Sequence, residues 1–201
     1  MARHPRVLSR LRAEIDGIAG LGPEATQPSR AQLRKMKYLE LVIRESMRLY
    51  PPVPVNARTA VKTTTLPVGG GSDGLSPILV RKGEAVSYSP YVIHRRKDIG
   101  EDSLDYRPER WENGALKHVG YGYVPFNAGP RNCLGQTFAL LQISYTIARL
   151  IQHRPFMAGP FDRAMSDVGK EKQILTMVLL CEEGCRVRFG SVGSMEDVQR
   201  D

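Results

Sequence analysis

Cys133 is the residue whose type and position most clearly suggest chemistry. It stands just before residues 135–152, an apolar segment that predicts a helix. The first turn of a helix has unpaired backbone N–H groups, and the helix dipole favours negative charge there, so the position favours a thiolate. A bound metal would lower the pKa of the thiol further. A lone cysteine at a helix start is more often a buried structural residue, and on these grounds that alternative stays open.

The residues around Cys133 would suit a flat, partly acidic ligand. Gly129 and Gly135 allow a tight turn and the close approach of a planar group. Phe126 could pack on an aromatic face, and Arg131 could hold a carboxylate. The loop therefore combines a candidate metal ligand with candidate contacts for a planar cofactor.

A second pair of residues, Glu45 and Arg48, could form an ion pair on one helix face. Residues three apart on a helix are neighbours, so the two charges can meet. A solvated surface pair of this kind would contribute little to stability. Leu41 and Leu49 flank Glu45 one turn away on either side, which favours partial burial instead. A buried pair needs further hydrogen bonds to offset the loss of solvation.

Two other patterns resemble functional motifs but are better explained as structure. Residues 69–74 satisfy Gly-x-Gly-x-x-Gly, yet a dinucleotide loop must follow a strand and open a helix. Pro67 precedes this segment and residues 75–77 contain a further proline, so a hairpin turn is predicted. Cys181 and Cys185 have no histidine partners nearby and do not indicate a metal site. No hydrolase signature of the Ser-His-Asp or Cys-His type is present.

The composition indicates a globular chain with a single core. It has 201 residues, a net charge of +8, and only three cysteines, too few for a disulfide scaffold, which favours a reducing compartment. No membrane span or signal peptide is predicted. The basic charge invites a nucleic-acid interpretation, but the cations are spread along the chain and no groove-binding motif occurs. A basic balance also suits an anionic cofactor or an acidic protein partner, and ordinary solvated surface accounts for most of these charges.

Apolar spacing predicts the helices that must position these residues. The three clear helices and one short helix are expected at residues 4–18, 36–50, 135–152 and 91–96. Residues 135–152 are apolar on nearly all sides, so this helix is expected to be deeply buried. Residues 25–30 are expected to be a polar connector.

Alternating residues predict short strands, which complete an α+β fold that is mainly helical with small antiparallel sheets. Short antiparallel strands are expected between residues 53 and 88. A later hairpin is expected to pair residues 173–181 with 185–189. Residues 97–124 lack a period, and so long an irregular segment is usually functional or held by a ligand. Residues 191–201 are expected to be a flexible tail.

The complete pattern around Cys133 resembles the haem-binding signature of the cytochrome P450 family. Residues 126–135 read Phe-x-x-Gly-x-Arg-x-Cys-x-Gly, and Ala139 stands where the longer pattern has alanine. The resemblance implies that Cys133 is the axial ligand to the iron of haem b. It also implies that the cofactor contacts Phe126, Gly129, Arg131, Gly135 and Ala139.

Two further motifs resemble the same family. Glu45-x-x-Arg48 is similar to its Glu-x-x-Arg motif, and Pro108-Glu109-Arg110-Trp111 is similar to the segment that supplies a second arginine. The family more often has phenylalanine at Trp111. The implied network of Glu45, Arg48 and Arg110 holds the irregular segment beneath the haem and does no chemistry. Arg58 is implied to reach a haem propionate with Arg131, the alternative being a surface strand residue.

The resemblance also implies an activity. Residues 66–71, 76–78 and 94–98 are similar to fungal enzymes that hydroxylate alkanes and fatty acids. An intact enzyme of this type is a monooxygenase that uses O2, acts on a small apolar substrate and receives electrons from NADPH through a reductase. Intact eukaryotic relatives reside at the endoplasmic reticulum membrane, while the localisation of this chain stays open.

The resemblance reaches only the C-terminal part of the family, so residues 1–190 are expected to form a partial domain. The helix that carries the distal acid–alcohol pair has no counterpart, and no catalytic residue can be assigned. The chain alone is therefore expected to be inactive. The alternatives are a truncated, non-catalytic fragment or haem-binding remnant and a basic binding protein without haem.

Overall fold

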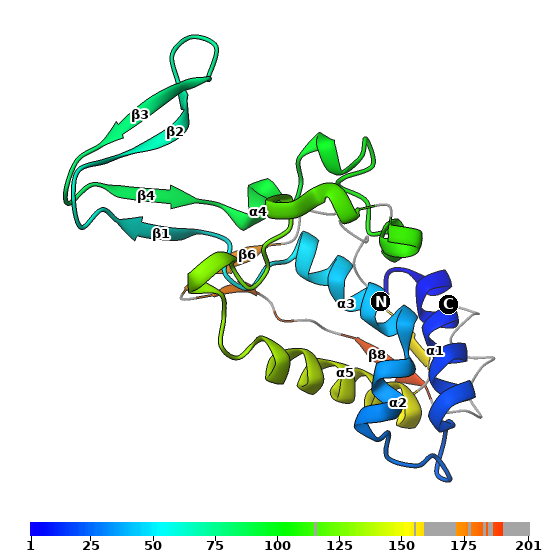
Figure 1. Cartoon of the computed structure of the whole chain (residues 1–201). Helices are drawn as coiled ribbons and strands as arrows, with labels where there is room; N and C mark the ends of the chain where they lie inside the picture. The colour runs from blue at the N-terminus through cyan, green and yellow to red at the C-terminus, as the bar shows by residue number, and fades with distance from the viewer. Residues whose placement is uncertain are drawn as a thin grey trace.

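The computed structural model describes residues 1–114, 116–154, 156–158, 172–176, 178–182, 184 and 187–190. Helices and short antiparallel sheets make up these residues, so the predicted fold class is confirmed (Figure 1). The α-helices are α1 (Pro5–Ala19), α2 (Arg30–Lys35), α3 (Lys37–Leu49), α4 (Pro90–Ile93) and α5 (Gln136–His153). The 3₁₀ turns are η1 (Lys97–Ile99), η2 (Pro108–Gly114), η3 (Lys117–Gly122) and η4 (Gly129–Arg131).

The hydrophobic core lies where α1, α3 and α5 meet. Leu11 and Ile15 of α1 are fully buried, as is Ile151 of α5, and they pack with the apolar face of α3. Glu14 of α1 accepts hydrogen bonds from the backbone N–H groups of Tyr38 and Leu39 at 2.7 and 2.8 Å. A carboxylate at the start of α3 satisfies N–H groups that lack partners inside the helix. The predicted helices at 4–18 and 36–50 are thus present and are clamped together.

Helix α2 occupies sequence next to the predicted polar connector, and the apolar spacing did not reveal it. Its first residue follows Ser29, whose hydroxyl accepts a hydrogen bond from the Gln32 N–H at 3.2 Å. The Gln32 side chain accepts one from the Ser29 N–H at 2.9 Å. This reciprocal arrangement is a capping box, which begins a helix even in a short polar segment. The spacing of Ser29 and Gln32 was the available sequence signal.

The prediction that α5 is deeply buried is wrong except near its C-terminal end. Its buried residues are Ala148, Ile151 and Gln152, whereas Phe138 is 71% exposed and Tyr145 is 38% exposed. An all-round apolar helix is buried only where other elements surround it. Helices α1, α2 and α3 contact one side of α5, and no other described element covers the opposite side.

The C-terminal end of α5 is anchored by Gln152. Its side-chain Nε2 lies 2.9, 3.1 and 2.9 Å from the carbonyl oxygens of Ala19, Gly20 and Thr26. Its own carbonyl accepts from the Gly22 N–H at 2.8 Å. Gln152 is fully buried, so it supplies partners to backbone groups at the end of α1 that water cannot reach.

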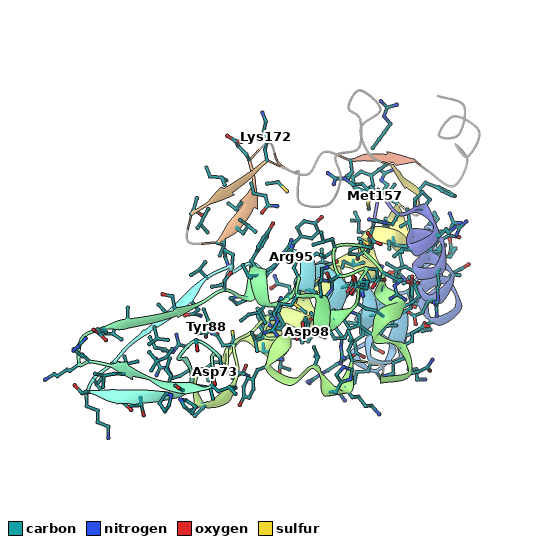
Figure 2. All side chains as sticks on the ribbon, turned by 90° about the horizontal axis from the view of Figure 1, so that it is seen from above. Asp73, Tyr88, Arg95, Asp98, Met157 and Lys172 are labelled. Atoms are coloured by element: carbon teal, nitrogen blue, oxygen red, sulfur yellow. The ribbon has the colours of Figure 1, made fainter. Side chains whose placement is uncertain are left out.

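The predicted strands between residues 53 and 88 form two separate hairpin-like pairs. Strand β1 (Asn56–Thr59) pairs with β4 (Ala85–Tyr88), and β2 (Thr64–Gly70) pairs with β3 (Ser76–Val80), both antiparallel. In both views these strands extend away from α1 and α2 (Figures 1 and 2). The Gly69 N–H donates to the Gly74 carbonyl at 2.8 Å, so the glycine-rich segment is the predicted hairpin turn.

The predicted pairing of residues 173–181 with 185–189 is wrong. Strand β6 (Gln173–Leu175) pairs with β7 (Leu179–Cys181), so the first segment folds back on itself. Strand β8 (Arg188–Gly190) pairs with β5 (Phe156–Ala158) instead. The Thr176 hydroxyl donates to the Val178 carbonyl at 3.2 Å and closes a turn between the two strands. Apolar residues continue through this turn, so the sequence pattern did not indicate it. Cys185 and the predicted tail at 191–201 lie outside the described residues.

Candidate functional site

The loop that carries Cys133 lies open on the surface, directly before α5. All residues from 128 to 135 are exposed, and the Cys133 thiol is not part of a disulfide. The loop is fixed by its backbone, since the Cys133 N–H donates to the Phe126 carbonyl at 2.9 Å. Gly129 has a φ of 69°, a left-handed conformation that glycine adopts without strain. The sulfur is therefore presented outward and is not packed in the core, which argues against a buried structural role.

The neighbours of Cys133 leave room beside the sulfur. Gly135 has a φ of −82°, and a Cβ added there would stand 3.8 Å from the Cys133 Sγ. Ala139 follows one turn later, half-buried, and its N–H donates to the Gly135 carbonyl at 2.8 Å. Phe126 is also half-buried and packs against the core, which anchors one end of the loop. Arg131 is exposed on the 3₁₀ turn η4.

Arg58 lies on β1, which is joined to the Cys133 loop through Asn127. Asn127 Oδ1 accepts from Asn56 Nδ2 and from the Tyr88 hydroxyl, both at 2.9 Å. Figure 2 places Tyr88 where the strands approach the helical part of the molecule. Arg58 itself is exposed, and its Nη1 donates to Asn56 Oδ1 at 2.8 Å and to the Ala57 carbonyl at 2.7 Å. The strand that bears Arg58 is thus tied to the loop, although Arg58 makes only local contacts.

Asn127 was not recognised from the sequence, although a signal existed. Its φ is 63°, so it adopts the left-handed conformation that asparagine tolerates better than most residues. An asparagine two positions before Gly129 is compatible with such a turn. The two hydrogen bonds from β1 and β4, however, depend on the tertiary fold.

Glu45 is fully buried and accepts hydrogen bonds from four different residues. Its Oε1 accepts from Arg48 Nη2 at 2.9 Å, from the Arg107 N–H at 2.9 Å and from Arg110 Nε at 2.8 Å. Its Oε2 accepts from Arg48 Nε and Trp111 Nε1, both at 2.9 Å. The structure therefore brings Glu45, Arg48 and Arg110 together, with the extra hydrogen bonds that a buried carboxylate requires.

The two arginines connect α3 to the irregular segment. Arg48 Nη1 donates to the carbonyls of His94 and Ser103, and Nη2 donates to the Asp105 carbonyl at 3.0 Å. Arg110 Nη1 donates to Asp102 Oδ1 at 2.9 Å. These contacts give the aperiodic residues after α4 a fixed conformation without a regular helix or strand.

Trp111 adds a hydrogen bond to the buried Glu45 network that the sequence did not predict. Its indole N–H donates to Glu45. Phenylalanine, which is more frequent at this position in the family that the sequence resembles, could not make this bond. We expect Trp111→Phe to lower the free energy of unfolding by about 1–2 kcal/mol, because one buried lone pair of Glu45 loses its donor. Urea denaturation measures this change. Tyr123→Phe is the control, since it removes an exposed hydrogen bond to the Arg44 carbonyl and should cost less.

The protonation of Glu45 couples stability to pH. Burial on its own would raise the pKa of Glu45, but Arg48, the Arg107 N–H and Arg110 hold that pKa below its ordinary value. A carboxylate with a depressed folded pKa contributes stability that is present above its unfolded pKa, about 4.3. That contribution is lost as the pH falls through the folded pKa.

We therefore expect Glu45→Gln to be less stable than the wild type at pH 7 by about 2–3 kcal/mol. The difference should narrow as the pH falls from about 4.3 towards the lower pKa of the folded state, because the wild-type carboxyl then takes up a proton too. Denaturation curves at several pH values measure it. Glu40→Gln is the control, since Glu40 forms an exposed pair with Arg44. A difference between wild type and Glu45→Gln that is the same at every pH would contradict the role assigned to the charge.

The donor set fits the thiolate side of a haem. An exposed free thiol stands beside a residue without a Cβ, and the exposed guanidinium of Arg131 lies in the same loop. No group of three His, Cys, Asp or Glu side chains that could hold a metal ion occurs among the described residues. A metal at Cys133 would therefore need further ligands of its own, and a porphyrin provides them to its iron.

No helix in the described part of the chain combines the length and the apolar character that crossing a membrane requires.

Comparison with known proteins assigns the chain to a family. The cytochrome P450 family model matches residues 1–173. A cytochrome P450 of Arthroderma benhamiae is 56% identical over 189 residues, which cover 93% of this chain and 38% of that protein. Cytochrome P450 52A3-A of Candida maltosa is 51% identical, over 76% of this chain and 30% of that protein. Cytochrome P450 monooxygenase milC of Cordyceps militaris is 48% identical, over 76% and 28%.

These relatives come from fungi, in agreement with the resemblance found in the sequence. The chain spans about a third of the length of the curated relatives it matches. The family model covers the helices α1 to α5, the strands β1 to β5, the buried Glu45 network and the whole Cys133 loop. This chain belongs to the cytochrome P450 family.

Proposed function

We propose that this chain is the haem-ligating part of a monooxygenase, with the Cys133 thiolate as the axial ligand of haem b. The observation that carries the proposal is the exposed, free Cys133 at the start of α5, inside a complete signature loop. The family match supports this choice of cofactor.

The other residues of the site would bind and orient the cofactor. Arg131 and Arg58 are cations that suit the two haem propionates. A flat ring can approach closely at Gly129, Gly135 and Ala139, where no side chain is larger than a methyl group, while Phe126 braces the loop from the core. A thiolate-ligated haem, when bound, activates O2 for insertion of one oxygen atom into a C–H bond. The buried network of Glu45, Arg48 and Arg110 would hold the segment beneath the ring.

Addition of haem to the full chain tests this proposal. The haem-loaded chain, once reduced and exposed to carbon monoxide, should show the long-wavelength Soret band of a thiolate-ligated complex. The band should grow in proportion to added haem and reach its maximum at one haem per chain. A spectrum without that band would contradict the assignment of Cys133 as ligand.

An alkane or a fatty acid is the substrate class that we propose for the intact enzyme. The support is the sequence similarity at residues 66–71, 76–78 and 94–98. Addition of lauric acid or dodecane to the intact haem enzyme should shift its ferric Soret band and yield a hydroxylated product. An equal response to a sugar of similar mass would contradict the class.

A second candidate, a non-catalytic haem-binding remnant, is favoured by the open surface of α5. Leu134 is fully exposed and Phe138 is 71% exposed, one and five residues after Cys133. No described residue covers this apolar surface, so water would reach the cofactor. Product analysis decides between the candidates, since a remnant would bind haem and consume NADPH through a reductase without hydroxylating any substrate.

An NADPH-dependent reductase is the proposed electron donor for the intact enzyme. A groove of about 650 Å³ lies between α2, α3 and the first turns of α5. Basic side chains, Arg30, Arg34, Lys37 and Arg44, line it, with Glu40 as the acidic exception. It adjoins the helix that begins after Cys133, and its charge suits an acidic partner.

We expect Arg34→Glu to slow the reduction of the haem-loaded protein by the reductase about threefold or more at low salt. The difference should shrink as salt screens the charges. Stopped-flow absorbance follows the reduction. Lys62→Glu makes the same change of charge at an exposed residue outside the groove and should have little effect. Equal slowing by both variants would show that only the net charge matters.

A further inference from the structure

His94 is a buried histidine that the motifs around Cys133 leave unexplained. It follows α4, its side chain is fully buried, and its ring lies 5.2 Å from that of Tyr123. Its Nε2 accepts a hydrogen bond from the Val124 N–H at 2.8 Å. An imidazole nitrogen that accepts carries no proton, so the proton of the neutral ring is on Nδ1.

The neutral form of the ring is maintained by its surroundings. Burial lowers the pKa of His94 to about 4, and the cations of Arg48 and Arg95 act in the same direction. The carbonyls of Arg48 and Met47, at the end of α3, act in the opposite direction. Nδ1 makes no hydrogen bond within the described residues. The two carbonyls therefore act on the ring without forming a hydrogen bond to Nδ1, while Nε2 forms one as an acceptor.

His94 contacts both the buried network and the chain that leads to Cys133. Its carbonyl accepts from Arg48 Nη1 at 2.9 Å, which ties its backbone to the network. Its side chain holds Val124, which is 7% exposed and lies two residues before Phe126. The Phe126 carbonyl accepts from the Cys133 N–H at 2.9 Å. Two successive backbone contacts, at Val124 and at Phe126, therefore separate His94 from the sulfur-bearing residue.

The other contacts of this segment differ from that of His94, because Phe126 packs against the core and the Tyr123 hydroxyl donates to the Arg44 carbonyl at 3.1 Å, but neither pairs the Val124 N–H. The Val124 carbonyl accepts from the Asn127 N–H at 3.1 Å, which closes a turn inside the loop but does not fix the loop to the core. The Asn127 side chain reaches β1 and β4, strands that extend from the helical part. Among the described residues, the His94 side chain accepts the hydrogen bond that joins the Val124 backbone directly to the segment held by Arg48.

We propose that His94 is a positioning residue for the thiolate ligand, with Nε2 as the acceptor that fixes the Val124 backbone and thereby the loop that presents Cys133. This role rests on the proposed haem-thiolate function. It predicts that the acceptor matters, and not only the volume of the ring. Glutamine can place its Oε1 close to the position of Nε2, whereas leucine fills the space without an acceptor.

Amide hydrogen exchange of the full chain tests the contact without haem. In His94→Leu, the Val124 and Cys133 amides should exchange about tenfold faster than in the wild type, as the loss of one buried hydrogen bond predicts. The Ile43 amide inside α3 reports global folding and should be unchanged. His94→Gln should restore slow exchange at Val124 and Cys133. Unchanged exchange at Cys133 in His94→Leu, with Ile43 protected, would overturn the proposal.

The ligand state provides a second readout. In the reduced, haem-loaded chain with carbon monoxide, His94→Leu should lower the ratio of thiolate-ligated to other complexes about tenfold. His94→Gln should match the wild type, and equal loss in both variants would overturn the role of the acceptor. Asparagine is too short to reach Val124, so His94→Asn should behave like His94→Leu. It takes the place of His94→Leu in both measurements if that variant does not fold. A wild type without the thiolate band would refute the proposed function, while the exchange data would still decide the His94 contact.

Discussion

Replacement of Cys133 by serine is expected to abolish the thiolate-type spectrum of the haem-loaded chain completely. A serine hydroxyl does not ionise near neutral pH, so the iron would lose its anionic ligand while the loop keeps its size. The ferrous carbon monoxide spectrum measures the loss. The substitution should leave the fold intact, because residues 128–135 are all exposed and Cys133 joins the loop through its backbone N–H and carbonyl.

Cys181→Ser is the matched control for this result. Cys181 is an exposed cysteine on β7, outside the signature loop. The control should keep the full thiolate band. Persistence of the band in Cys133→Ser would assign the ligand to another residue, and loss in both variants would point to a nonspecific effect of thiol removal.

Arg48→Met is expected to lower the free energy of unfolding by about 3–5 kcal/mol, which is the usual effect when one partner of a buried ion pair is removed. Arg48 and Glu45 are both fully buried. The substitution takes two hydrogen bonds from Glu45 and leaves the carbonyls of His94, Ser103 and Asp105 without the donor they share. Urea denaturation followed by circular dichroism measures the change.

Arg44→Met is the control because it removes an arginine from the same helix. Arg44 pairs with Glu40 at 2.6 Å, but both side chains are nearly half exposed. Solvent screening limits such a pair to about 0–1 kcal/mol. Effects of similar size in the two variants would show that the buried network does not stabilise the fold more than a surface pair does. The double variant Glu45→Gln, Arg48→Met should cost less than the sum of the single changes, because it leaves no buried charge unpaired.

The elements that follow from local patterns could be predicted, while features that depend on capping or on which other elements pack against a helix could not. Helices α1 and α3 have apolar residues on one face, and that face is the one buried. Helix α2 depends on the exchange of hydrogen bonds between Ser29 and Gln32, which apolar spacing does not register. The apolar composition of α5 predicted burial, but composition cannot specify which elements are present to cover a helix.

In the candidate site too, the features set by neighbouring residues could be predicted and those set by distant residues could not. The ten residues of the Cys133 loop are contiguous, so their pattern is visible in the sequence. The contacts that support them join residues far apart in the chain. Trp111 bonds to Glu45 across 66 positions, and Asn127 bonds to Asn56 across 71. Neither spacing has a period, and each contact exists only because tertiary packing brings the two segments together.

Helix α5 is held more firmly at its C-terminal end than at the end that follows Cys133. Its C-terminal end is clamped by the buried Gln152 and Ile151, whereas the end that follows Cys133 is covered on one side only. An 18-residue helix is about 27 Å long, so a tilt of a few degrees at the clamped end displaces the other end by more than about 1 Å. A displacement of that size would affect the proposed bond between the Cys133 sulfur and the haem iron. Substitutions at the C-terminal end of α1, where Gln152 binds, would therefore change the position of the Cys133 sulfur without altering the loop that bears it.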